Sequence, residues 1–145
     1  MEQLSNFDIE EIAPIFKINL ICIIDYHDLV HYPFADGSYI LNLANKHWTC
    51  LYIKDGKGVY FDSYGQIYPT KIKMFCKRLI YCDDTIQSLN SVACGYYCLY
   101  FLYWMTNKYK YNLEHTLNNF RAQFNDNEKY NDQILQKAIK KLCNP

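Results

Sequence analysis

Residues 48–62 have the sequence WTCLYIKDGKGVYFD, and this stretch decides how the first half of the chain folds. Residues 48–53 and 59–62 are rich in aromatic and β-branched side chains, which favour strands. Asp55-Gly56 lies between the two runs, and Asp-Gly is a preferred pair for the tight turn of a hairpin. The stretch therefore predicts two antiparallel strands joined by a short turn.

Further strand-like and helix-like segments flank this hairpin. Strand-like runs occupy residues 18–24 and 39–43, and a short extended segment is expected around residues 80–87. Apolar side chains at helical spacing predict amphipathic helices at residues 7–16, 70–79, 113–124 and 132–142. Residues 93–105, ACGYYCLYFLYWM, are apolar on almost every side of a helix, which predicts that this helix is buried. We expect an α+β fold in which an antiparallel sheet packs against this central helix.

Length and composition favour a single domain over residues 1–145. The chain is 50% hydrophobic with only 5 Gly and 4 Pro, which excludes a disordered or low-complexity sequence. Fifteen Lys and Arg balance fifteen Asp and Glu, so no net charge attracts the chain to nucleic acid or to an anionic membrane. The uncharged run at residues 92–105 is shorter than the roughly 20 residues that cross a bilayer. We expect no membrane partner and, from size, a monomer.

The cysteine content favours an intracellular protein. Seven cysteines are an odd number, and the chain begins Met1-Glu2-Gln3 without a charged, apolar leader. We therefore expect free thiols, a reducing compartment and no secretion.

Cys94 is the candidate nucleophile. It is expected at the start of the buried helix, where unpaired backbone N–H groups stabilise a thiolate. Ser91 before it is a cap type, and Gly95 after it would allow a substrate backbone to approach closely. The alternative is that Cys94 is a small buried apolar side chain, which is what we expect of Cys98 one turn later.

A thiol nucleophile needs a base, and the base needs a group that orients it. His47 stands at the start of one hairpin strand and Asp62 at the end of the other, so antiparallel pairing would bring the two together. Gln87 could donate its amide, with the Cys94 backbone N–H, to an oxyanion. Taken singly, His47 could equally be a surface side chain, Asp62 a turn residue and Gln87 a polar loop residue.

Three segments taken together resemble the adenain family, the adenovirus-type maturation cysteine proteases. These segments are His47-Trp48, residues 60–65 (YFDSYG) and residues 87–95 (QSLNSVACG). The order His, acid, Gln, Cys belongs to that family and to its relatives, the SUMO-specific proteases. The Gln-Ser-x-Asn-Ser-x-Ala-Cys-Gly block is particularly similar to adenain, and the resemblance extends from the opening helix through Met105.

The resemblance implies a papain-like core in permuted chain order and a thiol endopeptidase. It implies that Cys94 is the nucleophile, His47 the base, Asp62 the orienting acid and Gln87 the oxyanion donor, with Trp48 lining the cleft. It also implies cleavage next to glycine in precursor proteins, as in the capsid or core maturation of a DNA virus or a virus-derived element. The expected location is the host nucleus or cytoplasm, and the virion.

Departures from the family keep alternatives open. Adenain has Glu where this chain has Asp62, and Asp is the SUMO-protease residue. Adenain is stimulated by DNA and by a disulfide-linked peptide; here Cys76 and Cys82 are loose candidates for such a link, and we assign no cofactor. The alternatives are a deconjugating protease for a ubiquitin-like modifier and a non-catalytic binding module of the same fold.

Other patterns favour structural roles. His27 and His31 are four residues apart but lie among loop-type residues, so we expect no zinc site. The aromatic side chains of residues 96–104 are expected in the core, and the lysines of residues 137–141 on a solvated helix face.

Overall fold

The structure is a computed structural model that describes residues 1–44 and 47–144. Within these residues the strands are β1 (Leu20–Asp25), β2 (Gly37–Leu43), β3 (His47–Lys54), β4 (Lys57–Phe61) and β5 (Arg78–Tyr81). The α-helices are α1 (Asn6–Ile12), α2 (Thr70–Phe75), α3 (Cys94–Asn107), α4 (Leu113–Arg121) and α5 (Asn131–Cys143). Two short 3-10 helices are η1 (Tyr26–His31) and η2 (Glu128–Tyr130).

The hairpin predicted from residues 48–62 is confirmed. β3 and β4 pair antiparallel, with Cys50 opposite Phe61 and Lys54 opposite Lys57. Asp55 and Gly56 form the turn with φ angles of 53° and 77°. Positive φ at both central residues is what a tight hairpin turn with the right twist requires.

The expectation of an antiparallel sheet is wrong for its two edges. The five-stranded sheet has the order β1-β2-β3-β4-β5, and β3 runs antiparallel to both of its neighbours, β2 and β4. β1 is parallel to β2, and β4 is parallel to β5. In each case the connection crosses over a face of the sheet, through η1 or through α2, and returns the chain in the same direction.

The second helix is shorter than its sequence pattern predicts. α2 ends at Phe75, and residues 78–81, part of which was expected to be helical, form β5 instead. Leu79 pairs with Gly58, so the backbone of this segment finds its hydrogen-bond partners on the edge of β4. Edge pairing therefore outweighs the helical spacing of the apolar side chains.

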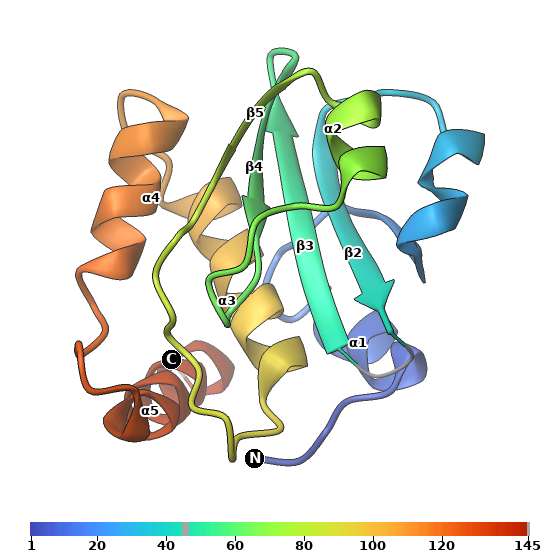
Figure 1. The fold of residues 1–145 in the computed structure, drawn as a ribbon. Coiled ribbons are helices and arrows are strands. Elements are labelled where there is room, and N and C mark those ends of the chain that lie inside the picture. Colours follow the sequence, from blue (N-terminus) through green and yellow to red (C-terminus); the bar gives the residue numbers. More distant parts are fainter. Residues whose placement is uncertain (45–46, 145) are drawn as a thin grey trace.

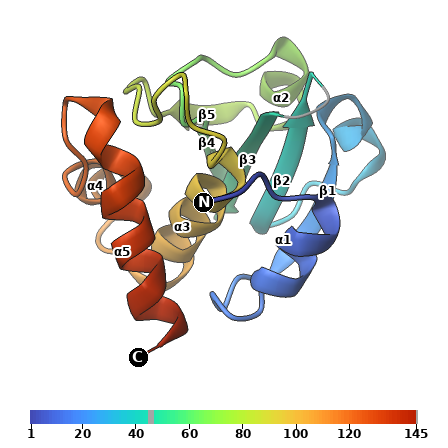
Figure 2. The ribbon, with the colours of Figure 1, turned by 90° about the horizontal axis from the view of Figure 1, so that it is seen from below.

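Helices cover both faces of the sheet (Figures 1 and 2). α1 and α3 pack on one face, and α4 and α5 lie on the outer side of α3. η1 and α2 cover the other face. Alternate residues of β3 therefore meet two different cores: Trp48 and Cys50 face α3, whereas Leu51 and Ile53 face α2.

The predicted central helix is the core element of the fold. Phe101 stacks on Phe61 of β4 with ring centroids 4.6 Å apart, and Phe120 of α4 meets both rings edge-on. Aromatic pairs in these arrangements add stability beyond the area that they bury. The aromatic side chains of residues 96–104 belong to this core, as expected.

No helix in the described part of the chain is both long enough and apolar enough to span a membrane. Residues 1–44 and 47–144 also contain no group of three or more His, Cys, Asp or Glu side chains that could hold a metal ion.

Candidate active site

The start of β3, the end of β4 and the start of α3 meet at the lower end of the sheet in Figure 1. These segments carry His47, Asp62 and Cys94. His47 and Cys94 are 47 positions apart in the sequence (94 − 47 = 47), and Asp62 lies between them. The fold therefore brings together three of the residues that the sequence singled out.

Cys94 is the first residue of α3 and is buried. The backbone N–H of Trp48 is directed at its Sγ over 3.5 Å. The first N–H groups of a helix have no partner within the helix, and the helix dipole is positive at this end. Both features stabilise negative charge on the sulfur.

His47 is held by Asp62. Its Nε2 lies 2.8 Å from Asp62 Oδ1, and the two side chains are 22% and 4% exposed. Because Nε2 faces the carboxylate, Nδ1 is the ring nitrogen left for the thiol. This is the base-and-orienter geometry that nucleophilic catalysis requires.

The surroundings of His47 favour its charged form. Burial lowers the pKa of the imidazole, but hydrogen bonds with Asp62 and Cys94, and the negative charges of both groups, raise it more, to about 9. The Asp62 carboxylate and the Cys94 sulfur thus both favour a proton on the His47 ring.

A tight turn after β4 fixes the acid. Asp62 Oδ1 also accepts a hydrogen bond from the Tyr64 backbone N–H at 2.8 Å, and the Asp62 carbonyl accepts one from Gly65 at 2.8 Å. The Tyr64 ring stacks on the His47 ring with centroids 4.9 Å apart. Tyr64 thus covers the face of the imidazole that Asp62 orients.

Gly65 is required where it stands. Its φ is 75°, and a Cβ on this residue would lie 2.7 Å from the backbone carbon of Asp84. Backbone atoms cannot move aside as the end of a flexible side chain can. The turn therefore packs against the backbone of residues 84–85 at a distance that leaves no room for a Cβ. This contact sets the spacing between the Asp62 turn and the segment that carries Gln87.

Gln87 is fully buried and is fixed from both ends of its side chain. Its Oε1 accepts from Ser63 Oγ at 2.5 Å, and its Nε2 donates to the Ser91 carbonyl at 2.9 Å and to Ser91 Oγ at 3.2 Å. Ser91 Oγ also accepts from the Ala93 N–H at 3.1 Å, just before Cys94. Gln87 therefore ties the Asp62 turn to the N-terminus of α3.

Trp48 and Gly95 support the site on the side of α3. Trp48 is 7% exposed, and its indole N–H donates to the Leu4 carbonyl at 2.9 Å. A Cβ on Gly95 would lie 3.2 Å from Leu4 Cβ and 3.3 Å from Trp48 Cδ1. The space beside Gly95 is thus filled by the N-terminal segment and by Trp48, and a substrate-binding role for Gly95 stays a prediction.

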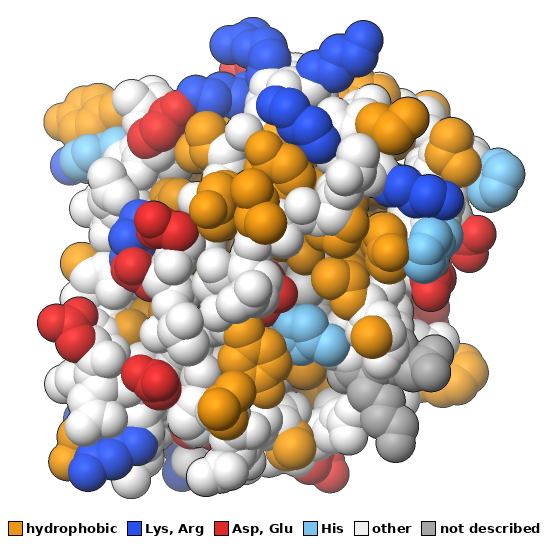
Figure 3. Space-filling view, viewed as in Figure 1, with side chains coloured by type: hydrophobic (Ala, Val, Ile, Leu, Met, Phe, Trp, Pro, Cys, Tyr) orange, Lys and Arg blue, Asp and Glu red, His pale blue; other side chains and the backbone are white. Residues whose placement is uncertain are grey.

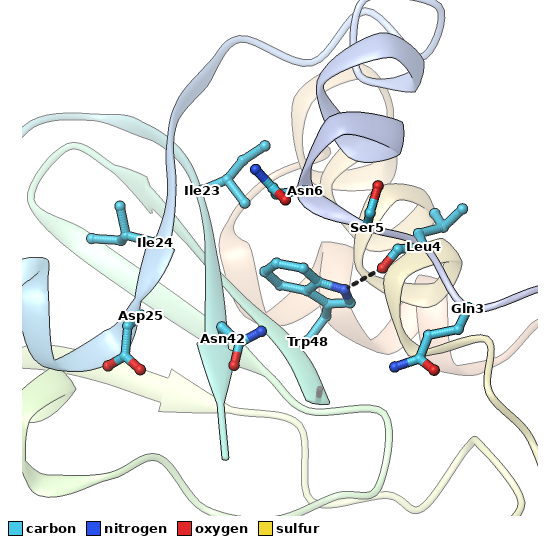
Figure 4. Close-up of a pocket in the computed structure, with 9 residues that line it drawn as sticks. All are labelled: Gln3, Leu4, Ser5, Asn6, Ile23, Ile24, Asp25, Asn42 and Trp48. Atoms are coloured by element: carbon cyan, nitrogen blue, oxygen red, sulfur yellow. Dashed lines mark hydrogen bonds between the residues drawn. The ribbon is translucent and has the colours of Figure 1, made fainter. Parts of the chain in front are cut away.

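A groove of about 460 Å³ borders Trp48 (Figure 4). Residues 3–6 form one side of it, and β1 and β2 contribute the other. Figure 4 shows Asn42 and Asp25 along the strands and Ile23 and Ile24 above them. The groove has room for a few residues of an extended peptide.

Sequence reasoning missed several supporting residues. Nothing in the type or spacing of Ser63 and Tyr64 showed that they contact Gln87 and His47. Ser91 was expected as a cap type; its Oγ accepts from the Ala93 N–H at 3.1 Å, and the N-cap residue of α3 is Ala93. Leu4 gave no sequence signal beyond its place ahead of an N-cap, Ser5, which accepts from the Asp8 N–H at 3.1 Å.

The remaining candidates lie away from this site. His27 bonds Asp25 at 2.7 Å, within the segment expected to be a loop, which is the 3-10 helix η1. Cys76 and Cys82 are free thiols with no exposed surface, so a disulfide with a partner would require local opening. Cys98 is fully buried, as expected.

Comparison with protein families and with curated proteins adds no relative: no family model matches this chain, and no curated protein matches it.

Proposed function

We propose that this chain is a cysteine endopeptidase of the adenain type, with a papain-like core in permuted chain order. It cleaves precursor proteins at glycine-containing sites, in the capsid or core maturation of a DNA virus or a virus-derived element. The observation that carries the proposal is that His47 contacts both Asp62 and Cys94 at the N-terminus of α3.

The first chemical step follows from the charge state of this set. The Cys94 thiolate attacks the scissile carbonyl carbon, and the carbonyl oxygen becomes an oxyanion. His47, an imidazolium whose Nε2 is held by Asp62 at 2.8 Å, donates its Nδ1 proton to the leaving amine. The products are an acyl-enzyme on Cys94, the released amine and a neutral imidazole.

Deacylation uses the same groups in the reverse direction. Neutral His47 takes a proton from water, which attacks the thioester carbonyl. The bond to sulfur breaks, the acid product leaves, and the thiolate–imidazolium pair is restored. Asp62 stays ionised and keeps the ring oriented in both halves of the reaction.

The oxyanion would be stabilised at the start of α3. The Cys94 backbone N–H is the first donor, and the Gln87 amide is the second. In the resting structure both Gln87 Nε2 contacts go to Ser91, at 2.9 and 3.2 Å. To donate to the oxyanion, Gln87 Nε2 would give up its longer hydrogen bond, the one to Ser91 Oγ.

The substrate preference follows from the narrow approach to Cys94. Cys94 is only 5% exposed and lies beside Trp48, so a side chain next to the scissile bond has little room. Glycine fits this restriction, and the groove beside Trp48 would receive the adjoining residues. Precursor proteins are the proposed partners. We assign no activating peptide or DNA.

Cleavage of a peptide library tests the function. The chain is incubated with peptides that contain Gly-Gly and Gly-Ala bonds among matched bonds without glycine, and products are identified by mass spectrometry. We expect cleavage at glycine-containing bonds by the wild type and none by Cys94→Ala. Cys98→Ala is the matched control, because it removes a thiol one turn later on the same helix and should retain activity.

Two results would contradict the proposal. Cleavage that survives Cys94→Ala would show that Cys94 is not the nucleophile. Cleavage confined to a ubiquitin-like modifier fused through its terminal glycines would instead support the deconjugating alternative.

A further inference from the structure

We propose that the groove between η1 and α2 docks an acidic polypeptide segment that carries large apolar side chains. This binding site lies on the face of the sheet opposite α3, and its assignment does not rest on the proposed chemistry.

The groove has the size and the lining of a binding site. It encloses about 490 Å³. Its apolar lining includes Leu29, Val30, Phe34, Met74 and Phe75. Val30 and Met74 are 75% and 71% exposed, and Phe34 is 49% exposed. Exposed large apolar side chains that gather around one hollow mark interaction sites, whereas scattered ones do not.

These side chains are held out by an ordered scaffold. The Asp25 side chain caps η1 by accepting from the His27 N–H at 2.9 Å. The Tyr39 hydroxyl donates to the Ala35 carbonyl at 2.5 Å, which fixes the loop that carries Phe34. Phe75 meets the Phe34 ring edge-on at 5.6 Å. A groove formed in advance loses little conformational entropy when it binds.

The charge around α2 identifies the partner's chemistry. Residues 63–82 contain Lys71, Lys73, Lys77 and Arg78 and no Asp or Glu, in a chain whose net charge is zero. All four side chains are exposed, and Lys71 lines the groove itself. Figure 3 shows apolar side chains over α2 and Lys and Arg side chains along the upper edge of the same face.

The two walls of the groove differ, which orients the segment. The η1 wall carries Asp25 and Asp28. Asp25 is already paired with His27 at 2.7 Å, and hydrogen bonds with His27, together with the charges of His27 and Lys71, lower the pKa of its carboxyl. Acidic side chains of a bound segment would therefore lie toward Lys71, and its apolar side chains toward Val30 and Met74.

Selection from a random peptide library tests the proposal. Peptides displayed on phage are selected on the wild type and, in parallel, on Met74→Asp and Lys71→Glu. Both positions are exposed, so the variants should keep the far-UV circular dichroism spectrum and the melting temperature of the wild type. Phe7→Asp, at an equally exposed apolar residue on α1, and Lys137→Glu on α5 are the matched controls.

We expect the wild type to enrich peptides with a net negative charge and at least two large apolar side chains. Their affinity, measured by fluorescence anisotropy, should fall at least tenfold in Met74→Asp and Lys71→Glu and stay within twofold in both controls. Cys94→Ala should bind these peptides as tightly as the wild type, which would show that peptide binding at the groove does not depend on catalysis.

Three results would overturn the proposal. The first is no enrichment, or enriched peptides that bind the groove variants as well as the wild type. The second is a dimer in light scattering that Met74→Asp dissociates, which would make a second copy the occupant. The third is binding to phosphatidylserine vesicles, but not to the acidic peptides, that is lost in Lys71→Glu.

Discussion

Asp62→Asn tests the electrostatics of the site without a substrate. The substitution keeps the shape of the side chain but removes the charge that faces His47 Nε2 at 2.8 Å. The pKa of His47 is about 9, against an ordinary 6.5, and this difference corresponds to roughly 3 kcal/mol. Burial, which lowers the pKa, is unchanged in the variant. We therefore expect the His47 pKa to fall by at least about one unit, a tenfold change in proton affinity.

Nitrogen-15 NMR of labelled histidine measures this pKa directly. The chain has 4 histidines, and the spectrum of His47→Gln identifies the signals of His47. Asp25→Asn is the matched control, because it removes the carboxylate paired with the exposed His27 at 2.7 Å. This control should leave the His47 titration where it is in the wild type.

A His47 pKa that is the same in Asp62→Asn and in the wild type would show that Asp62 does not raise it. It would mean that the 2.8 Å contact does not hold the proton in solution. A wild-type His47 that already titrates near 6.5 would equally contradict the raised pKa, because the contacts with Asp62 and Cys94 would then not outweigh burial.

Three further predictions follow from the same contacts. Gly65→Ala should lower the free energy of unfolding by at least about 2 kcal/mol in urea denaturation, because φ is 75° and the new Cβ meets backbone at 2.7 Å; an unchanged midpoint would disprove this packing. Gln87→Ala should lower kcat/KM for a cleaved peptide by about 100-fold or more while the His47 pKa stays raised, and a loss in KM alone would argue against an oxyanion role. The folded-state pKa of His47 lies above its unfolded value, so the stability that protonated His47 contributes is complete below pH 6.5 and is lost as pH rises to about 9. The urea midpoint of the wild type should therefore fall more over this pH range than that of Asp62→Asn. Equal falls in the two proteins would contradict this linkage.

Local patterns predicted the central fold well. The Asp55-Gly56 turn between two β-rich runs can form only one kind of short connection, and the apolar run 93–105 can only be buried. Both signals depend on neighbours in the sequence. The two parallel edges were not predictable in this way. β1 and β5 are placed by crossovers through η1 and α2, and they pair with residues at least 17 positions away in the sequence (for example, 39 − 22 = 17 and 78 − 57 = 21).

In the candidate site, too, some residues could be predicted from the sequence and others could not. His47, Asp62 and Cys94 could be named because residue types and their order are informative about nucleophilic catalysis. The roles of Tyr64 and Ser91 depend on which ring or carbonyl lies within 5 Å after folding, and no spacing rule gives that. Leu4 is the extreme case, because it reaches Trp48 from 44 residues away.

If Cys94 is an activated nucleophile, as we propose, its thiol reacts faster than the other thiols of the chain. Burial raises the pKa of Cys22 and Cys82 to about 11 and that of Cys76 and Cys98 above the ordinary range, whereas Cys143 is exposed and serves as an internal reference. The chain is treated at pH 7 with a peptide-like electrophile that ends in glycine, and mass spectrometry locates the label. We expect fast modification of Cys94 ahead of Cys143, and we expect His47→Ala to abolish it. Slow labelling of Cys143 ahead of Cys94, or labelling of Cys94 that does not depend on His47, would contradict it.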